Sequence, residues 1–495
     1  MDRTDIMAEE EKRPLLNGDP DVAVETVNPG SVDVNKPPII KLYKRRWYIL
    51  LLFSFLTFTQ GGVWNTFGPI ADSAESAFGW NDADIALLTN WGPITYVIST
   101  LFFSWLVDVK GLRWATLITA ALVFFGTGIR CITSDPAHAK WLINLGHALN
   151  GFAGPIVMGA PPVLSVTWFP PHERTTATAI STVFGAGFGT AVSFVIGPLL
   201  VRELTNNTLD NSTTGMLHNI TNHTNTEEVN AQRQDIMKLM YIEFGFMAVL
   251  MLLILIYFPA KPPSPPSISA ATERMEFKKG LSALLKHWPF WLVAAPYAIA
   301  GGVYNCWSSV IDVNLKPLGI KQTEAGWIGF YATMAGSAVS LCVARFADVF
   351  SGRMKTLLIC LYFCAVGAMA WFLLLCNQYI PFNTPSLYIS TIMVGVFIMA
   401  ATPLFYELCC ELSYPIAEGI TNLFLTMLNN VTGLIFLLVF MIPHVGTMWM
   451  NWFMIGSIIV CLPILFIMKE KYSRLDIDEQ RVAPPEKGPD ENILN

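Results

Sequence analysis

The sequence predicts an all-α membrane protein with about twelve transmembrane helices in two six-helix bundles. Three observations support this fold class. Apolar stretches of about twenty residues recur along the chain, a proline-rich segment divides them into two sets, and only 14% of the residues are charged. Because a soluble protein of this size carries roughly a quarter of charged residues, the missing charge indicates a surface that faces lipid.

The apolar stretches set the boundaries of the two bundles. Each stretch is long enough to cross a hydrocarbon core of about 30 Å. The N-terminal bundle covers residues 47–258, and its expected spans are 47–70, 84–107, 114–133, 141–167, 175–201 and 235–258. The C-terminal bundle covers residues 289–468, and its expected spans are 289–313, 325–345, 356–376, 385–408, 418–441 and 448–468.

Polar segments flank and separate the bundles. Residues 1–46 are rich in acidic residues, Pro and Gly and have no apolar period, which predicts a disordered tail. Residues 259–288 open with the proline run from Pro262 to Pro266 and then turn basic, so we expect a semi-rigid linker. Residues 469–495 form a second polar tail.

Two independent features predict the orientation of the chain. Lys and Arg are concentrated in both tails, in the linker and in the loops after the second and eighth spans, and such segments face the cytosol. The loop 202–234 is expected to be luminal, because glycans are added on that side and the loop carries several Asn-x-Ser/Thr sequons. These sequons begin at Asn206, Asn211, Asn219 and Asn222. Both features place the two termini in the cytosol.

The loops after the second and eighth spans share a pattern of an acid, a glycine turn and a base. The two copies consist of Asp108, Gly111 and Arg113 in the first half and of Asp348, Gly352 and Arg353 in the second. Recurrence at matching positions indicates an internal repeat, as expected for two related bundles around a central site.

Other classes of protein find little support in the sequence. No nucleophile elbow, metal-ligand cluster or phosphate-binding loop stands out, and the loops are too short for a catalytic domain. An enzyme, a cofactor and a bound metal are therefore not expected. The net charge of −6 is mild and gives no support for nucleic-acid binding.

The segment around Asp108, Gly111 and Arg113 resembles the loop 2–3 signature of the major facilitator superfamily. The segment 168–174 is similar to that superfamily's loop 4–5, and the glycines at 185, 187 and 189 resemble its glycine-rich fifth helix, where small residues permit close helix contact. The resemblance implies that charged residues lock and release the cytosolic side of the two halves. The residues expected at this gate are Asp108, Gly111, Arg113, Asp348, Arg353, Glu407 and Glu411.

A finer resemblance lies in the segment 405–419, which reads FYELCCELSYPIAEG. This segment is similar to a region of the solute carrier 49 family, which includes the haem and choline transporters related to the feline leukaemia virus receptor. The chain most resembles a lysosomal member of that family, and the resemblance implies proton-dependent transport of pyridoxine. Two alternatives remain open: a choline, ethanolamine or haem carrier, and a membrane sensor or receptor that transports nothing.

Interrupted helices near the middle of the bilayer are the expected place for a solute site. Aromatic rings there can stack on a flat or cationic ring and amides can bond to hydroxyl groups, although the same residue types often only pack helices together. Tyr304 is the leading candidate, since by position it resembles a tyrosine that packs against choline in the relatives, whose first-helix tryptophan corresponds to Phe58. The candidates are Phe58, Gln60, Trp64, Asn65, Asn90, Trp91, Asn150, Tyr297, Tyr304, Asn305, Trp307 and Asn429.

Ionisable residues inside a membrane are candidates for function, because they are costly to place there. Glu243 in the sixth span and His147 in the fourth are the deepest, so either can carry a coupling proton. Asp312 is a third candidate, although it and Arg130 lie near helix ends, where they can only pair or reach the interface.

The N-terminal tail contains a short sorting pattern. Glu11 precedes the pair Leu15 and Leu16 by four residues, which fits the acidic dileucine signal. In a flexible cytosolic tail such a signal binds clathrin adaptor complexes, so we expect a multi-pass protein of the lysosomal membrane. The remaining expected partners are the small-molecule substrate, protons and membrane lipid, and the expected state is a monomer.

Overall fold

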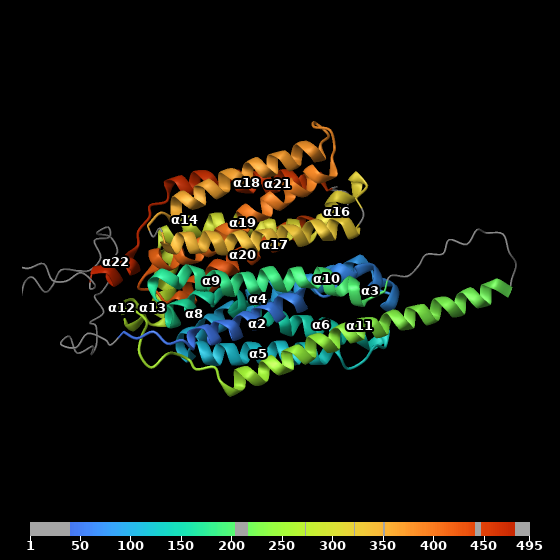
Figure 1. Cartoon of the computed structure of the whole chain (residues 1–495), viewed down its shortest axis with the longest axis horizontal. Coiled ribbons are helices and arrows are strands. Elements are labelled where there is room, and N and C mark those ends of the chain that lie inside the picture. The colour runs from blue at the N-terminus through green and yellow to red at the C-terminus, as the bar shows by residue number, and fades with distance from the viewer. Residues whose placement is uncertain are drawn as a thin grey trace, which may run out of the picture. The chain divides into compact units, whose positions relative to one another are not determined.

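The helices of the computed structural model run side by side in two sets, which we call the N-half and the C-half (Figure 1). The structure describes residues 40–202, 216–272, 274–320, 322–349, 352–440 and 447–480. The N-half consists of α2 (Arg46–Trp64), η1 (Gly68–Ile70), α3 (Ala71–Phe78), α4 (Asp82–Trp105), η2 (Leu106–Lys110), α5 (Leu112–Arg130), α6 (Pro136–Phe152), α7 (Gly154–Gly159), α8 (Pro161–Trp168), η3 (Pro171–Glu173), α9 (Arg174–Thr182), η4 (Val183–Gly189), α10 (Thr190–Leu200) and α11 (Met216–Ile256).

The linker and the C-half follow. The linker contains two short helices, α12 (Ile268–Ala271) and α13 (Phe277–Lys286). The C-half consists of α14 (Trp288–Pro296), η5 (Tyr297–Gly301), α15 (Gly302–Ser309), α16 (Ile311–Leu315), η6 (Lys316–Leu318), α17 (Gln322–Val349), α18 (Met354–Cys376), α19 (Thr384–Ser413), α20 (Glu418–Phe440) and α21 (Met448–Ile467). A last short helix, α22 (Ser473–Gln480), comes after α21.

The length and composition of the helices agree with a membrane protein. Among the described residues, 10 helices are long and apolar enough to cross a membrane, and the bent helix 136–168 raises the number to 11. The segment from α14 to α15 occupies the place of the expected seventh span. It contains two prolines, two tyrosines and Asn305, which lower its mean hydropathy below that of the other spans.

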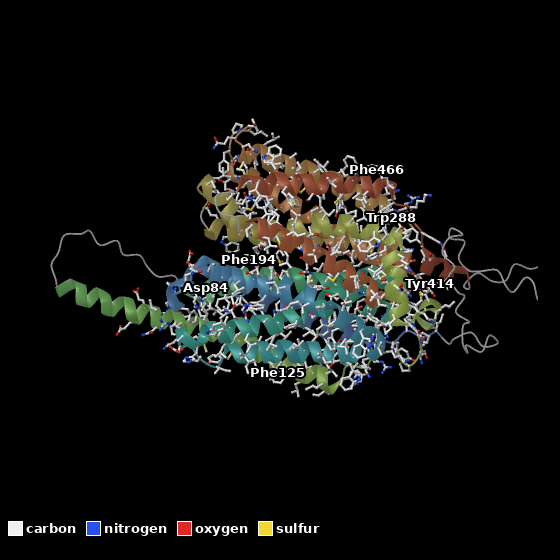
Figure 2. The ribbon with its side chains drawn as sticks, turned by 180° about the vertical axis from the view of Figure 1, so that it is seen from behind. Asp84, Phe125, Phe194, Trp288, Tyr414 and Phe466 are labelled. Atoms are coloured by element: carbon white, nitrogen blue, oxygen red, sulfur yellow. The ribbon has the colours of Figure 1, made fainter. Side chains whose placement is uncertain are left out.

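The outer faces of the bundles carry large apolar side chains. Phe125 in α5 is 60% exposed and Phe466 in α21 is 54% exposed, and both lie on the outside of the helices in Figure 2. Each half also has its own buried apolar core, centred on residues such as Phe53 and Leu164 in the N-half and Tyr362 and Leu404 in the C-half. Exposed aromatic and aliphatic faces around buried cores are what lipid contact requires.

Proline and glycine interrupt several helices near their middle. The helix 136–168 bends by 44° where α7 ends and Pro161 begins α8, because proline lacks a backbone donor and clashes with the preceding turn. The helices of the fifth and seventh spans widen into the π-helical segments η4 and η5, a feature that is frequent at functional sites.

The two ends of the bundles differ in their covering elements. One end carries the start of α2 together with α12, α13 and α22, and we call it the tail side (Figure 1). The other end carries α3, α16 and the start of α11, and we call it the loop side (Figure 1). Asp84 lies near the loop side and Tyr414 near the tail side (Figure 2).

The structure leaves part of the expected sites undescribed. The sorting residues Glu11, Leu15 and Leu16 and the sequons at Asn206 and Asn211 lie outside the described residues, and the sequons at Asn219 and Asn222 fall in the first turns of α11. On the tail side, residues 473–480 of the expected polar tail form α22, which packs on α12 and α19. The sequence did not predict this helix.

Candidate functional site

Amides and tryptophans tie together the inner helices of the N-half. Gln60 of α2 donates from Nε2 to the backbone oxygen of Asn150 in α6 (3.3 Å), and Asn150 donates from Nδ2 to the backbone oxygen of Gln60 (3.2 Å). Trp64 donates from Nε1 to the backbone oxygen of Thr89 in α4 (3.0 Å). The Oδ1 atom of the buried Asn150 has no hydrogen-bond partner among the described residues.

Other candidates of the N-half make contacts of the same kind. Asn65 donates to Ser193 Oγ in α10 (2.8 Å), and Trp91 donates from Nε1 to Asn144 Oδ1 in α6 (2.9 Å). Asn90 is half-buried on α4. The side chains of Asn65 and Trp91 thus link helices within the N-half.

A second group of candidates meets in the C-half. Asn305 of α15 donates to Asn429 Oδ1 of α20 (3.2 Å), and Asn429 donates to the backbone oxygen of Tyr297 (3.3 Å). Tyr297 in turn shares a hydrogen bond with Tyr406 of α19 through the two hydroxyl groups (3.0 Å). Asn305 is exposed whereas the other three are buried, so Asn305 presents the amide that is most open to a solute.

The two halves meet between these groups. Tyr96 of α4 and Thr426 of α20 form a short hydrogen bond through their side-chain oxygens, and both residues are buried. On the C-half, Asn429 follows Thr426 by less than one helical turn. On the N-half, Gly151 packs against Thr95, next to Tyr96. We call the group of Gln60, Trp64, Asn150, Tyr96, Thr426, Asn305 and Asn429 the central polar layer.

Three aromatic candidates lie inside one half instead. The hydroxyl of Tyr304 is directed at Gly395 of α19, where an added Cβ atom would lie 2.6 Å from it. Trp307 donates from Nε1 to Asn451 Oδ1 in α21 (2.8 Å). Phe58 packs against Phe246 of α11, with ring centroids 6.1 Å apart. These contacts give each ring a packing role in its own half.

A buried ion pair lies in the N-half. Arg130 of α5 donates from Nη2 to Glu243 Oε2 of α11 (2.7 Å), and the Thr66 hydroxyl donates to Glu243 Oε1 (2.7 Å). The Arg130 side chain is 0% exposed and that of Glu243 is 16% exposed. His147 is also buried, its Nδ1 contacts the backbone oxygen of Ile143 (3.0 Å), and its Nε2 has no partner among the described residues.

The structure thus places two of the three candidates for the proton carrier inside the N-half. Glu243 and His147 lie inside the N-half, and Glu243 has a cationic partner in Arg130, which the sequence placed at a helix end. The side chain of Asp312 lies outside the described part of the chain. Within the described residues, no group of three or more His, Cys, Asp or Glu side chains is arranged to hold a metal ion.

The repeated loop pattern lies on the tail side. Gly111 has a φ of 84° and Gly352 a φ of 91°, values that favour glycine and explain why both loops carry it. Asp348 of α17 accepts hydrogen bonds from the backbone N–H groups of Thr175 (3.0 Å) and Thr176 (2.7 Å) at the start of α9. The C-half thus caps a helix of the N-half.

Asp108 is half-buried like Asp348, whereas the two arginines of the loop pattern are exposed. Asp108 lies in a cleft of about 440 Å³ that is also lined by Val109 and by the linker residues from Arg274 to Phe277. Arg113 and Arg353 are exposed at the starts of α5 and α18. In this structure Asp348 makes the contact between halves, and Asp108 faces the linker.

The gate candidates Glu407 and Glu411 are buried and paired with a residue of α22. Arg474 donates from Nε to Glu411 Oε1 (3.0 Å) and from Nη2 to Glu407 Oε1, and it also lies 3.5 Å from Glu418. Burial lowers the pKa of the Arg474 guanidinium, but Glu407 and Glu411 raise it well above its usual value. Glu418 is paired with Arg274 of the linker as well (2.7 Å).

Sequence reasoning missed Arg474 and its neighbours Arg174 and Asp478 as parts of this site. One signal pointed to them. Glu407 and Glu411 lie one helical turn apart at the end of a long apolar helix, and carboxylates buried in this way require a cationic partner. The sequence offered several Arg and Lys residues in the tails and the linker, and nothing in their spacing selected Arg474.

Comparison with known proteins identifies the family. The model of the Major Facilitator Superfamily matches residues 53–437. The Solute carrier family 49 member 4 homolog of Xenopus tropicalis is 42% identical over 446 residues, which cover 89% of this chain and 95% of that protein. The choline/ethanolamine transporter FLVCR1 of Mus musculus is 27% identical over 446 residues, which cover 86% of this chain and 76% of that protein.

The fold has a counterpart among solved structures. A variant of the E. coli fucose:proton symporter FucP matches with a TM-score of 0.63 and 15% identity, over 86% of this chain and 100% of that chain. The fold expected from the sequence, two six-helix bundles of the major facilitator type, is thereby confirmed. The chain belongs to the major facilitator superfamily and, within it, to solute carrier family 49.

Proposed function

We propose that this membrane transporter is a proton-dependent carrier of pyridoxine in the lysosomal membrane and that it works by alternating access of its two halves to a central site. The resemblance to a lysosomal member of solute carrier family 49 supports the cargo and the location. The buried ion pair between Arg130 and Glu243 is the observation that carries proton dependence.

The central polar layer is the proposed solute site. Asn305 and Asn429 offer amides on the C-half, and Gln60 and Asn150 offer amides on the N-half. Pyridoxine is a flat ring with hydroxyl groups, so amides can bond to its hydroxyls and ring nitrogen while Trp64 stacks on its face. Tyr96 and Thr426 close the layer where the halves touch.

The remaining solute candidates support this site from behind. Asn65 directly follows α2, which carries Gln60 and Trp64, and the neighbouring helix α4 carries Asn90 and Trp91. On the C-half, the backbone oxygen of Tyr297 accepts a hydrogen bond from Asn429 and so holds that side chain in place. Tyr304, Trp307 and Phe58 fix the positions of their helices by packing. In this proposal, replacing one of these rings lowers the affinity for the solute by shifting a helix, not by removing a contact with the solute.

Glu243 is the proposed proton carrier. When its carboxylate binds a proton, it loses the charge that holds Arg130, and the contact between α5 and α11 weakens. A change of protonation thus becomes a change of packing inside the N-half. His147 is the second candidate, because its unpartnered Nε2 lies in the same half, and Asp312 is the third.

The lysosomal address is proposed from the tail. Glu11, Leu15 and Leu16 form the expected dileucine signal for clathrin adaptor complexes, and the four sequons from Asn206 to Asn222 are the expected glycan sites. In this orientation the tail side faces the cytosol and the loop side faces the lumen.

Choline or ethanolamine is the second candidate cargo. The more distant relatives are named choline/ethanolamine transporters, and the aromatic residues of the layer can also surround a quaternary ammonium group. Against this cargo, Phe58 replaces the tryptophan of those relatives and packs on Phe246. A sensor that binds a solute without moving it is the third candidate.

Uptake into whole cells tests the proposal. Changing Leu15 and Leu16 to Ala redirects the protein to the cell surface, where labelled pyridoxine is offered at acidic and neutral external pH. We expect uptake at acidic pH that unlabelled pyridoxine suppresses. Absence of pyridoxine uptake alongside uptake of labelled choline would establish the second candidate, and binding without uptake of either would establish the sensor.

A pair of variants tests the proton carrier within the same assay. Glu243→Gln keeps the shape of the side chain but cannot change its charge. It is made together with Arg130→Met so that no buried charge is left without a partner, and we expect uptake that no longer depends on pH. Glu227→Gln is the matched control, because Glu227 is exposed on the same helix. If both variants retain the pH dependence of the wild type, Glu243 does not carry the proton.

A further inference from the structure

The short helix α22 is anchored to the C-half at its first turn. Arg474 is 0% exposed and makes ion pairs with Glu407 and Glu411 of α19. The carboxylate of Glu411 also accepts the backbone N–H groups of Arg474 (3.0 Å) and Leu475 (3.1 Å). A carboxylate that caps a helix start and pairs with its arginine holds that helix through charge and backbone together.

The same helix contacts the N-half one turn later. Asp478 is buried, and its Oδ2 atom lies 3.3 Å from Nη1 of Arg174, which is the first residue of α9. Asp478 also accepts the backbone N–H and the hydroxyl of Ser269 in the linker helix α12 (both 2.8 Å). Arg174 donates in turn to the hydroxyls of Ser267 (2.6 Å) and Ser269 (2.9 Å).

These contacts differ in strength. Arg474 is held by several carboxylate and backbone bonds within one half. Among the described residues, Asp478 meets the N-half through one ion pair, which it makes with Arg174. The capping of α9 by Asp348 lies directly beside this ion pair, because Thr175 and Thr176 follow Arg174. When the halves separate on the tail side, α22 therefore stays with the C-half and its contact with Arg174 opens.

We propose that α22 is a latch, which we call the C-terminal latch (residues 473–480), that holds the tail side closed through Asp478 and Arg174. Arg474 positions the latch on the C-half and Asp478 fastens it to the N-half. Opening of this contact is then a required step of the transport cycle. The proposal rests on alternating access, which the proposed function also assumes, but not on the cargo or on proton coupling.

The latch is tested by measuring the distance between the halves on the tail side. Lys44, before α2, and Lys286, before α14, are each replaced by a ketone-bearing amino acid to which a spin label is attached. This chemistry leaves the native cysteines in place. Both lysines are exposed. Distance distributions are recorded on the purified full chain in lipid nanodiscs without any solute, so the result does not depend on the identity of the cargo.

The informative variant is Asp478→Asn, which removes the charge that meets Arg174 but keeps an oxygen for the Ser269 N–H. We expect the ratio of open to closed tail-side distances to rise about tenfold, the usual effect of losing one charged hydrogen bond. Asp476→Asn is the matched control, because Asp476 is exposed on the same helix. We expect it to match the wild type.

Two outcomes overturn the latch. One is a distance distribution for Asp478→Asn that equals that of Asp476→Asn. The other concerns Ser269→Ala, the second variant in case Asp478→Asn fails to fold, since it removes one hydroxyl that joins Asp478 and Arg174. We expect this variant to open the tail side to a smaller extent, and an unchanged distribution contradicts the proposal. If the distances behave as expected but the wild-type protein takes up no pyridoxine, the result counts against the proposed cargo alone and not against the latch.

Discussion

Replacing Arg130 with Met removes the buried cation of an ion pair and leaves the charge of the half-buried Glu243 without its partner. The two side chains are 2.7 Å apart, with 0% and 16% of their surfaces exposed. Thr66 remains as a hydrogen-bond donor to Glu243, but a hydroxyl dipole cannot replace a full positive charge in a medium of low dielectric constant. The Arg130→Met variant should therefore be strongly destabilised.

The size of the effect follows from the burial of the pair. Removing one partner of a buried ion pair costs about 3–5 kcal/mol, whereas replacing both partners by neutral residues of similar volume is often close to neutral. The double variant Arg130→Met with Glu243→Gln should therefore recover most of the stability. A difference of about 3 kcal/mol between the single and double variants corresponds to more than a hundredfold in the folding equilibrium.

Thermal unfolding of the detergent-purified proteins checks this cycle. We expect the Arg130→Met variant to unfold at the lowest temperature, with the double variant close to the wild type. Arg113→Met is the matched control, because Arg113 is exposed at the start of the same helix, and it should unfold like the wild type. A double variant no more stable than Arg130→Met would refute the reasoning, because the loss would then come from packing and not from an unpaired charge.

Two further substitutions test the packing of each half. Gly189→Ala should lower the unfolding temperature, because its Cβ would lie 2.4 Å from the Phe58 backbone oxygen and such overpacking costs about 1–3 kcal/mol. Gly245→Ala is the control, since its Cβ would have no heavy atom within 4 Å. Equal unfolding temperatures of the two variants would contradict the close approach at Gly189. Asn451→Leu should leave the Trp307 indole N–H and the buried amide of Asn314 without their partners, at a cost of about 1–3 kcal/mol for each group. Partial recovery of the melting temperature by Trp307→Phe in the same chain would support the share that comes from the indole, and no recovery would count against it.

The positions of the helices could be predicted from the sequence because lipid imposes a simple rule on length and composition. The expected fourth span, 141–167, became the bent helix 136–168, since a count of apolar residues does not register where Pro161 breaks a helix. The loop pattern was also visible in advance. Gly111 and Gly352 both adopt a positive φ, so the repeat in sequence reflects a repeat in backbone geometry.

The partners of the charged residues could not be predicted in the same way. Glu407 and Glu411 were expected at a gate, but their partner Arg474 follows the last span, where no periodicity indicates a docked helix. Arg130 was expected to pair or to reach the interface, and only the fold shows that α11 brings Glu243 to it. The direction of an aromatic side chain could not be predicted either. Tyr304 and Trp307 lie one turn apart and so share a face of α15, and only the structure shows that both point into the C-half.

The helix α11 has a practical consequence for imaging this protein. It is continuous over 41 residues, which corresponds to about 62 Å at 1.5 Å per residue, roughly twice the thickness of a hydrocarbon core. A small transporter offers electron microscopy few features outside the detergent micelle by which particles can be aligned. A rigid helical fusion partner joined in register to the first turns of α11 would extend the same rod and supply such a feature without touching the gate residues of the tail side.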